Sequence, residues 1–140
     1  MPSRCVFPRV EVDFKNREQL ISADLSCVKQ ARDFAEEVAA DYGFDANARY
    51  QLKLAMSEAV TNAIQHGSTS TADQITIWAV DEDGSLTFYV RDTGQFVPRV
   101  RSGGDMPESG RGLEFMRRLM DEVDLQPGQD GTLVRFSKRP

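Results

Sequence analysis

Residues 56–67 read MSEAVTNAIQHG and place Glu58, Asn62 and His66 at every fourth position of an otherwise largely apolar stretch. On a helix, at about 100° per residue, side chains four apart lie only about 40° from each other, so these three share one line. The apolar residues spread over a broad adjacent face: Leu52, Met56, Ala59, Val60, Ala63 and Ile64. The spacing therefore predicts a buried helix whose polar line lies at the edge of the core and forms one wall of a pocket.

The polar line also has a purely structural interpretation. In it, Glu58 is exposed to solvent, Asn62 is a core amide bonded to a neighbouring backbone group, and His66 is a packed structural side chain. A buried polar group without a partner costs about 1–3 kcal/mol, so three such groups in register favour the pocket.

The chain as a whole has the composition of a single globular domain over residues 1–140, with 40% hydrophobic and 28% charged residues. Its net charge of −5 disfavours direct binding to nucleic acid or to an anionic membrane. The sequence contains no run of about 18 apolar residues, the length that a membrane span requires. Its first residues lack the apolar core of a secretory signal. These features predict a cytoplasmic protein, in which Cys5 and Cys27 are free thiols.

Hydrophobic periodicity predicts three helices and several strands. The predicted helices span about 25–42, ending before Gly43, then 45–66 with Asp45 as N-cap, and about 112–122. The predicted strands span 6–22, with alternation over Val10–Phe14, then 74–80 and 86–91 as a hairpin, and 123–125 and 132–137 as a second hairpin around a turn at 127–131. Residues 92–112 are predicted to form one long loop, which in a compact domain is usually functional or disordered.

This element order predicts an α/β (α+β) two-layer sandwich, in which three helices cover one face of a mixed, mostly antiparallel sheet. The alternating segment Val10–Phe14 is either an internal strand or an edge strand that pairs with its copy in a homodimer.

Glycines mark three further positions in the second half of the chain. The strand LTFYV runs directly into Asp92-Thr93-Gly94, and the sequence Ser109-Gly110-Arg111-Gly112-Leu113 leads into the third helix. Glycines there would let backbone N–H groups approach an anion at the positive end of a helix. Gly131-Thr132 opens the last strand. Each piece alone is also explained by an ordinary turn or connector.

Taken in order, these pieces resemble the motif set of the GHKL ATPases, which share the Bergerat nucleotide-binding fold. The pieces are E-x-x-x-N-x-x-x-H-G, D-x-G, G-x-G and G-T. Within that superfamily the chain is most similar to the bacterial anti-sigma factor serine/threonine kinases, especially in LAMSEAVTNAIQHG (residues 54–67) and SGRGLEFMRRLMDEVDL (residues 109–125). The resemblance covers nearly the whole chain and implies a single histidine-kinase-like ATPase domain.

The resemblance implies ATP or ADP and Mg²⁺ as cofactors. In it, Asn62 holds the Mg²⁺ that bridges the triphosphate, and Glu58 is the general base for the substrate hydroxyl. Asp92 accepts a hydrogen bond from the adenine amino group, Gly94 gives the base close approach, and Thr132 supports the same end through water. One helical turn separates the Cβ atoms of Glu58 and Asn62 by about 6 Å, which leaves room for a hydroxyl beside the γ-phosphate.

The resemblance further implies a phosphate-binding turn at Gly110, Arg111, Gly112 and Leu113, and a lid over ATP at about 95–109. His66 would line the pocket without a chemical role. The family usually has D-x-G-x-G-F-D-P, whereas this chain has DTGQFVP (residues 92–98), without the second glycine. That departure bears on lid closure, nucleotide affinity and turnover.

By resemblance, the substrate is a STAS-domain anti-sigma-factor antagonist, and a sigma factor is the second partner. Some relatives are switch kinases that bind no sigma factor. Two other interpretations compete: a binding module that uses nucleotide only as a structural ligand, which the altered segment after Asp92 favours, and an α/β interaction domain without a nucleotide site.

Overall fold

The computed structural model of the chain describes residues 17–67, 73–92, 107–128 and 131–140. Within these ranges five strands form one sheet in the order β1-β2-β3-β5-β4, and every pairing is antiparallel. The strands are β1 (Arg17–Ser22), β2 (Gln74–Glu82), β3 (Ser85–Asp92), β4 (Glu122–Gly128) and β5 (Gly131–Lys138). The helices are η1 (Leu25–Cys27), α1 (Val28–Tyr42), α2 (Ala46–Asn62), η2 (Ala63–Gly67) and α3 (Pro107–Leu119).

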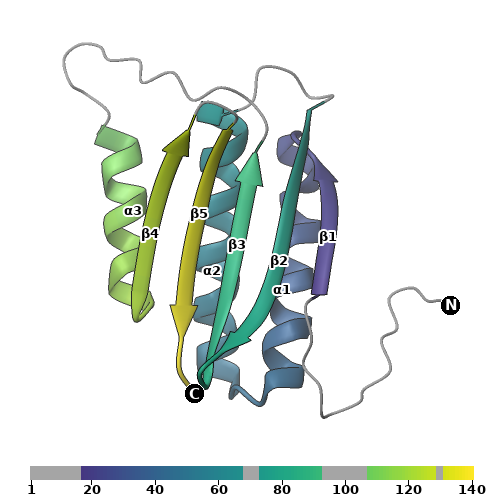
Figure 1. Cartoon of the computed structure of the whole chain (residues 1–140), viewed down its shortest axis with the longest axis vertical. Helices are drawn as coiled ribbons and strands as arrows, with labels where there is room; N and C mark the ends of the chain where they lie inside the picture. The colour runs from purple at the N-terminus through teal and green to yellow at the C-terminus, as the bar shows by residue number, and fades with distance from the viewer. Residues whose placement is uncertain (1–16, 68–72, 93–106, 129–130) are drawn as a thin grey trace, which may run out of the picture.

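The helices α1, α2 and α3 lie on the same side of the sheet, which confirms the predicted two-layer sandwich (Figure 1). The core fills the space between the layers, where Phe88 of β3 packs against Phe34 of α1 and Phe136 of β5, with ring centroids 6.2 and 5.5 Å apart. Among the described residues, no helix has the length and apolar character that a membrane span requires.

Helix α1 buries apolar side chains at three- and four-residue intervals, including Val28, Phe34 and Val38. It ends at Gly43, as expected, because that glycine adopts the left-handed conformation (φ 102°) that closes a helix at little cost. Its predicted start was three residues early. Residues 25–27 form the separate 3₁₀ turn η1, which the Asp24 side chain caps by accepting the Ser26 N–H at 3.1 Å.

Helix α2 begins at its predicted cap, since the Asp45 side chain accepts the Ala48 N–H at 2.9 Å. The prediction that it runs as a regular helix to His66 was wrong. The α-helix ends at Asn62, and the chain continues through Gly67 as the π-helical turn η2. Turns of this kind often lie at functional sites, and periodicity alone does not distinguish them from α-helix.

Asp45→Ala is expected to lower the free energy of unfolding by about 1 kcal/mol, because the first turn of α2 loses a side-chain acceptor for an N–H that has no partner within the helix. Urea denaturation measures the change, and Asp124→Ala on the exposed strand β4 is the matched control. Equal losses in the two variants would contradict a capping role for Asp45.

The hairpin β2–β3 matches its prediction and is slightly longer at its ends. Asp83 and Gly84 form the two-residue turn, with φ values of 56° and 85°. Positive φ at both positions is the requirement of a type I′ turn, which an Asp-Gly pair satisfies. Strand β2 alternates as expected, with Ile75, Ile77 and Ala79 buried toward the helices.

Helix α3 begins at Pro107, five residues before the predicted start at Gly112, and ends at Leu119 rather than at Glu122. Proline is favoured at the first helical position, and the glycines that predicted a loop lie inside the first turns. Strand β4 extends through Pro127 and Gly128, which the sequence placed in a turn. Proline is tolerated there because β4 is an edge strand of the sheet.

The described residues do not include positions 93–106 of the predicted loop. They also do not include the alternating segment Val10–Phe14 of the predicted first strand.

The outer face of the sheet, opposite the helices, carries a connected set of polar and aromatic side chains. Trp78 stacks on Tyr89 with ring centroids 5.0 Å apart, and Tyr89 Oη donates to Glu82 at 2.7 Å. Arg135 donates to both Glu82 (3.0 Å) and Glu122 (3.1 Å). The Tyr89 hydrogen bond foremost, with help from Arg135, holds the pKa of Glu82 below its usual value. Strands β2, β3, β5 and β4 are therefore tied together on this face by their own side chains.

Candidate functional site

Four segments that are distant in sequence meet at one end of the sheet, the upper end in Figure 1. They are the end of α2 with η2, the end of β3, the start of β5 and the start of α3. Turn η2 contacts both β3 and β5, and α2 packs against α3. Motifs that lie up to about 75 positions apart in the sequence are therefore close together at this end of the sheet.

Asp92 and Thr132 form a buried polar pair at this end. Their exposed fractions are 2% and 6%, and the Thr132 N–H donates to Asp92 Oδ1 at 3.3 Å. Thr132 Oγ1 is also buried, and it has no hydrogen-bond partner in the structure as described. Buried polar atoms are nearly always hydrogen-bonded, so this hydroxyl is available to a polar group of a ligand or to water. The pair fits the adenine end of a nucleotide site.

Glu58 and Asn62 occupy the edge of the core, as the spacing predicted. Both side chains are half-buried, whereas Leu52, Met56 and Val60 on the adjacent face are fully buried. Asn62 is the last residue of α2, directly before the π-helical turn. The line of polar residues thus ends where the helix meets β3 and β5.

Gly112 in α3 lies directly against Glu58. A methyl group at position 112 would lie 3.1 Å from Glu58 Cδ and 3.4 Å from Cγ, and closer still to Oε2. Gly112 is buried, and Leu113 is half-buried and packs on the core. Gly110 and Arg111 precede Gly112 in the same helix, but their side-chain surroundings lie outside the described residues.

The start of α3 suits an anion, because the first N–H groups of a helix have no partner within it and carry its positive end. Gly112, further along the same helix, lies against Glu58, so phosphate at the first turns of α3 would lie on the helix that contacts this carboxylate. Phosphoryl transfer with a general base requires the base to lie near the bound phosphate.

Several predicted site residues stay predictions. Gly94 and residues 95–106 of the predicted lid lie outside the described residues, and residues 107–109 form the first turn of α3. His66 belongs to η2, and its side chain is not among those described.

Clustered His, Cys, Asp or Glu side chains do not mark a metal site in the part of the chain that the structure describes. The described residues contain no group of three or more His, Cys, Asp or Glu side chains that could hold a metal ion. Mg²⁺ commonly keeps several waters and binds through substrate phosphates with one or two protein ligands. Asn62, with its side-chain carbonyl at the edge of the core, fits that type of site.

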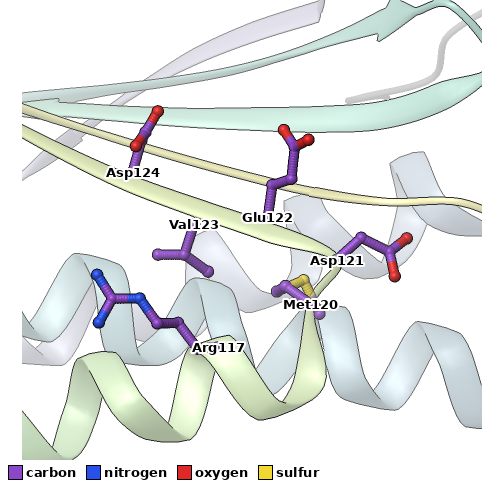
Figure 2. Close-up of a pocket in the computed structure, with 6 residues that line it drawn as sticks. All are labelled: Arg117, Met120, Asp121, Glu122, Val123 and Asp124. Atoms are coloured by element: carbon purple, nitrogen blue, oxygen red, sulfur yellow. The ribbon is translucent and has the colours of Figure 1, made fainter.

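A pocket also lies between the end of α3 and the start of β4 (Figure 2). It is lined by Arg117, Met120, Asp121, Glu122, Val123 and Asp124. Figure 2 shows Glu122 and Asp124 on the side of β4 that faces away from Arg117. The pocket lies toward the opposite end of α3 from Gly112, so it is separate from the candidate nucleotide site.

The sequence did not predict that Glu58 touches Gly112 or that the Thr132 backbone bonds Asp92. Both contacts join segments at least 40 residues apart. The only sequence signal was the joint presence of the motifs, which says that they meet but not which atoms touch.

Comparison with known proteins identifies the family of the chain. The model of the histidine kinase-like ATPase domain family matches residues 21–138. The anti-sigma F factor of Clostridium acetobutylicum is 36% identical over 97 residues, which cover 63% of this chain and 68% of the relative. The anti-sigma F factor of Heyndrickxia coagulans is 33% identical over 94 residues, which cover 59% of this chain and 64% of the relative. The chain thus spans about two thirds of the length of these relatives.

Solved structures show the same fold. The RsbU and RsbW domains of Rv1364c from Mycobacterium tuberculosis match with a TM-score of 0.70 and 24% identity, over 89% of this chain and 32% of that one. The histidine kinase domain of the blue-light activated histidine kinase from Erythrobacter litoralis EL346 matches with a TM-score of 0.53 and 19% identity, over 84% of this chain and 61% of that one. The family match, the relatives and the fold agree with the resemblance seen in the sequence. The chain belongs to the histidine kinase-like (GHKL) ATPases, in the family of the bacterial anti-sigma factor kinases.

Proposed function

We propose that this chain is a Mg-ATP-dependent protein serine/threonine kinase that phosphorylates a STAS-domain anti-sigma-factor antagonist and also binds and inhibits a sigma factor. The names of the curated relatives, anti-sigma F factors, support the partner-switching role. The observation that carries the kinase proposal is the contact between Glu58 and Gly112 at the start of α3, at the same end of the sheet as the buried Asp92–Thr132 pair.

The nucleotide would be held at two points. Asp92 would accept a hydrogen bond from the adenine amino group through its carboxylate, and Thr132 Oγ1 would gain the partner that it lacks among the described residues. Asn62 would contribute an oxygen to Mg²⁺ between the phosphates and α2. The first turn of α3 would bind phosphate oxygens through backbone N–H groups.

Bound Mg-ATP supplies a γ-phosphoryl group and a leaving group, ADP. Glu58 would accept the proton of the attacking serine or threonine hydroxyl, whose oxygen bonds to the γ-phosphorus as the bond from that phosphorus to the β–γ bridging oxygen breaks. The half-burial of Glu58 leaves the carboxylate reachable from the edge of the core. Because phosphoryl transfer depends mainly on positioning and charge, the phosphate-binding turn matters at least as much as the base.

The direct test is incubation of the full chain with Mg-ATP and a candidate STAS-domain antagonist, with intact-mass spectrometry of the antagonist. Transfer predicts a gain of one phosphate on a single serine or threonine. A wild-type protein that binds ATP but transfers nothing to any antagonist would instead support the binding module. Absence of ADP binding at millimolar ligand would leave only an interaction domain without a nucleotide site.

Sigma-factor binding is tested separately, by identifying what co-purifies with the chain in ATP and in ADP. Capture of a sigma factor that depends on the nucleotide supports partner switching. Capture of the antagonist alone, with transfer intact, would indicate a switch kinase.

A further inference from the structure

Glu58 is packed against bare helix backbone. The Cα of Gly112 faces its carboxylate so closely that a methyl group there would lie 3.1 Å from Cδ and nearer to Oε2. Side-chain atoms ordinarily keep about 3.5–4.0 Å between carbons, so a methyl group at position 112 would displace the Glu58 carboxylate from this position. The three nearest atoms that such a methyl group would meet, Oε2, Cδ and Cγ, all belong to Glu58, so the tightest contact comes from this one side chain.

The position of the Gly112 backbone is set by the core. Met116, one turn further along α3, is fully buried, and Met120 is buried one turn beyond it. Ala55, Met56 and Ala59, which flank Glu58 on α2, are fully buried as well. Buried side chains therefore hold both helices near the contact, and neither helix can move away cheaply.

No hydrogen bond or ion pair of the Glu58 side chain occurs among those of the described residues, in contrast to Asp92, whose carboxylate accepts a backbone N–H. A glutamate side chain that hydrogen bonds do not restrain has several rotamers. Contact with the backbone at Gly112 therefore limits which of them the carboxylate can adopt.

We propose that Gly112 is a positioning residue for Glu58: by lacking a Cβ, it lets the base carboxylate lie directly beside the first turns of α3. The inference rests on the proposed kinase function and adds to it. One glycine then serves both the phosphate-binding turn and the base, so the distance between the γ-phosphate and the carboxylate is set by the packing of α3 on α2.

The contact itself is tested by a thermal-unfolding cycle that does not depend on activity. Inside a helix, Gly→Ala normally stabilises, because alanine loses less backbone freedom on folding. We expect Gly112→Ala to raise the unfolding midpoint less in the wild type, where the methyl group has to displace the Glu58 carboxylate, than in the Glu58→Ala background, where the carboxylate is gone. Glu114→Ala, on the exposed side of α3, should shift the midpoint equally in both backgrounds. Equal shifts from Gly112→Ala in the two backgrounds would overturn the contact.

The positioning role is tested by kinetics with Mg-ATP and the antagonist. We expect Gly112→Ala to lower kcat at least about tenfold while the KM for Mg-ATP changes much less, because the backbone N–H is retained and the base is displaced. In the Glu58→Asp variant the side chain is one carbon shorter, so a methyl group at position 112 should displace its carboxylate less. Adding Gly112→Ala to that variant should therefore lower kcat only slightly further. A rise in KM with kcat unchanged would show that Gly112 serves nucleotide binding alone and would overturn the proposal.

The two experiments separate the outcomes. If the wild type transfers no phosphate, the proposed function fails and the positioning role fails with it, whatever the unfolding cycle shows. If the wild type is active and Gly112→Ala is as active as the wild type, the positioning role alone fails.

Discussion

Glu58→Gln is expected to lower the rate of phosphate transfer to the proposed antagonist by about 10²–10⁴-fold, the contribution that a positioned general base typically makes. Glutamine keeps the shape of the side chain and its contact with Gly112, so the packing between α2 and α3 is preserved. It cannot accept the hydroxyl proton, however. We therefore expect ADP affinity and the unfolding midpoint to stay close to those of the wild type.

Single-turnover transfer measured at saturating Mg-ATP isolates this effect from nucleotide binding. Glu37→Gln is the matched control, because Glu37 lies on the exposed side of α1 and undergoes the same change of group. Transfer that persists at the wild-type rate in Glu58→Gln would remove Glu58 from the role of base, while leaving the fold and the nucleotide site untouched.

Asp92→Asn is expected to weaken ADP binding by about ten- to a hundredfold or more. A hydrogen bond to a charged group contributes about 1.5–3 kcal/mol, and each 1.4 kcal/mol is a factor of ten in affinity. The amide oxygen can still accept the Thr132 N–H that Asp92 Oδ1 accepts at 3.3 Å. The amide nitrogen would then face the adenine amino group, donor against donor, at a buried position.

Isothermal titration with ADP measures this loss, and the unfolding midpoint without nucleotide checks that the fold is intact. Asp124→Asn, on the exposed face of β4, makes the same chemical change away from the site. Unchanged ADP affinity in Asp92→Asn, with the control also unchanged, would show that Asp92 does not contact the base. A large fall in the midpoint would assign it a structural role through Thr132.

Local sequence patterns predicted most elements because their causes are local. Gly43 ends α1 through its own backbone conformation, Asp45 caps α2 three residues away, and Asp83-Gly84 forms a turn from its own φ values. Predictions failed where a local signal was ambiguous. The glycines before Gly112 suggested a loop, yet α3 begins at Pro107, because packing of its apolar face outweighs the low helix propensity of glycine.

The candidate site divides in the same way. The fourfold spacing of Glu58 and Asn62 determined that their side chains share one edge of a buried helix, and the ordered motifs indicated a nucleotide-binding family, since both properties follow from neighbours in the chain. Only the tertiary structure decided that Glu58 lies on Gly112 and that Asp92 bonds the Thr132 backbone. These contacts depend on the register of β3 with β5 and the packing of α3 on α2, which arise from the burial of side chains spread over the whole chain.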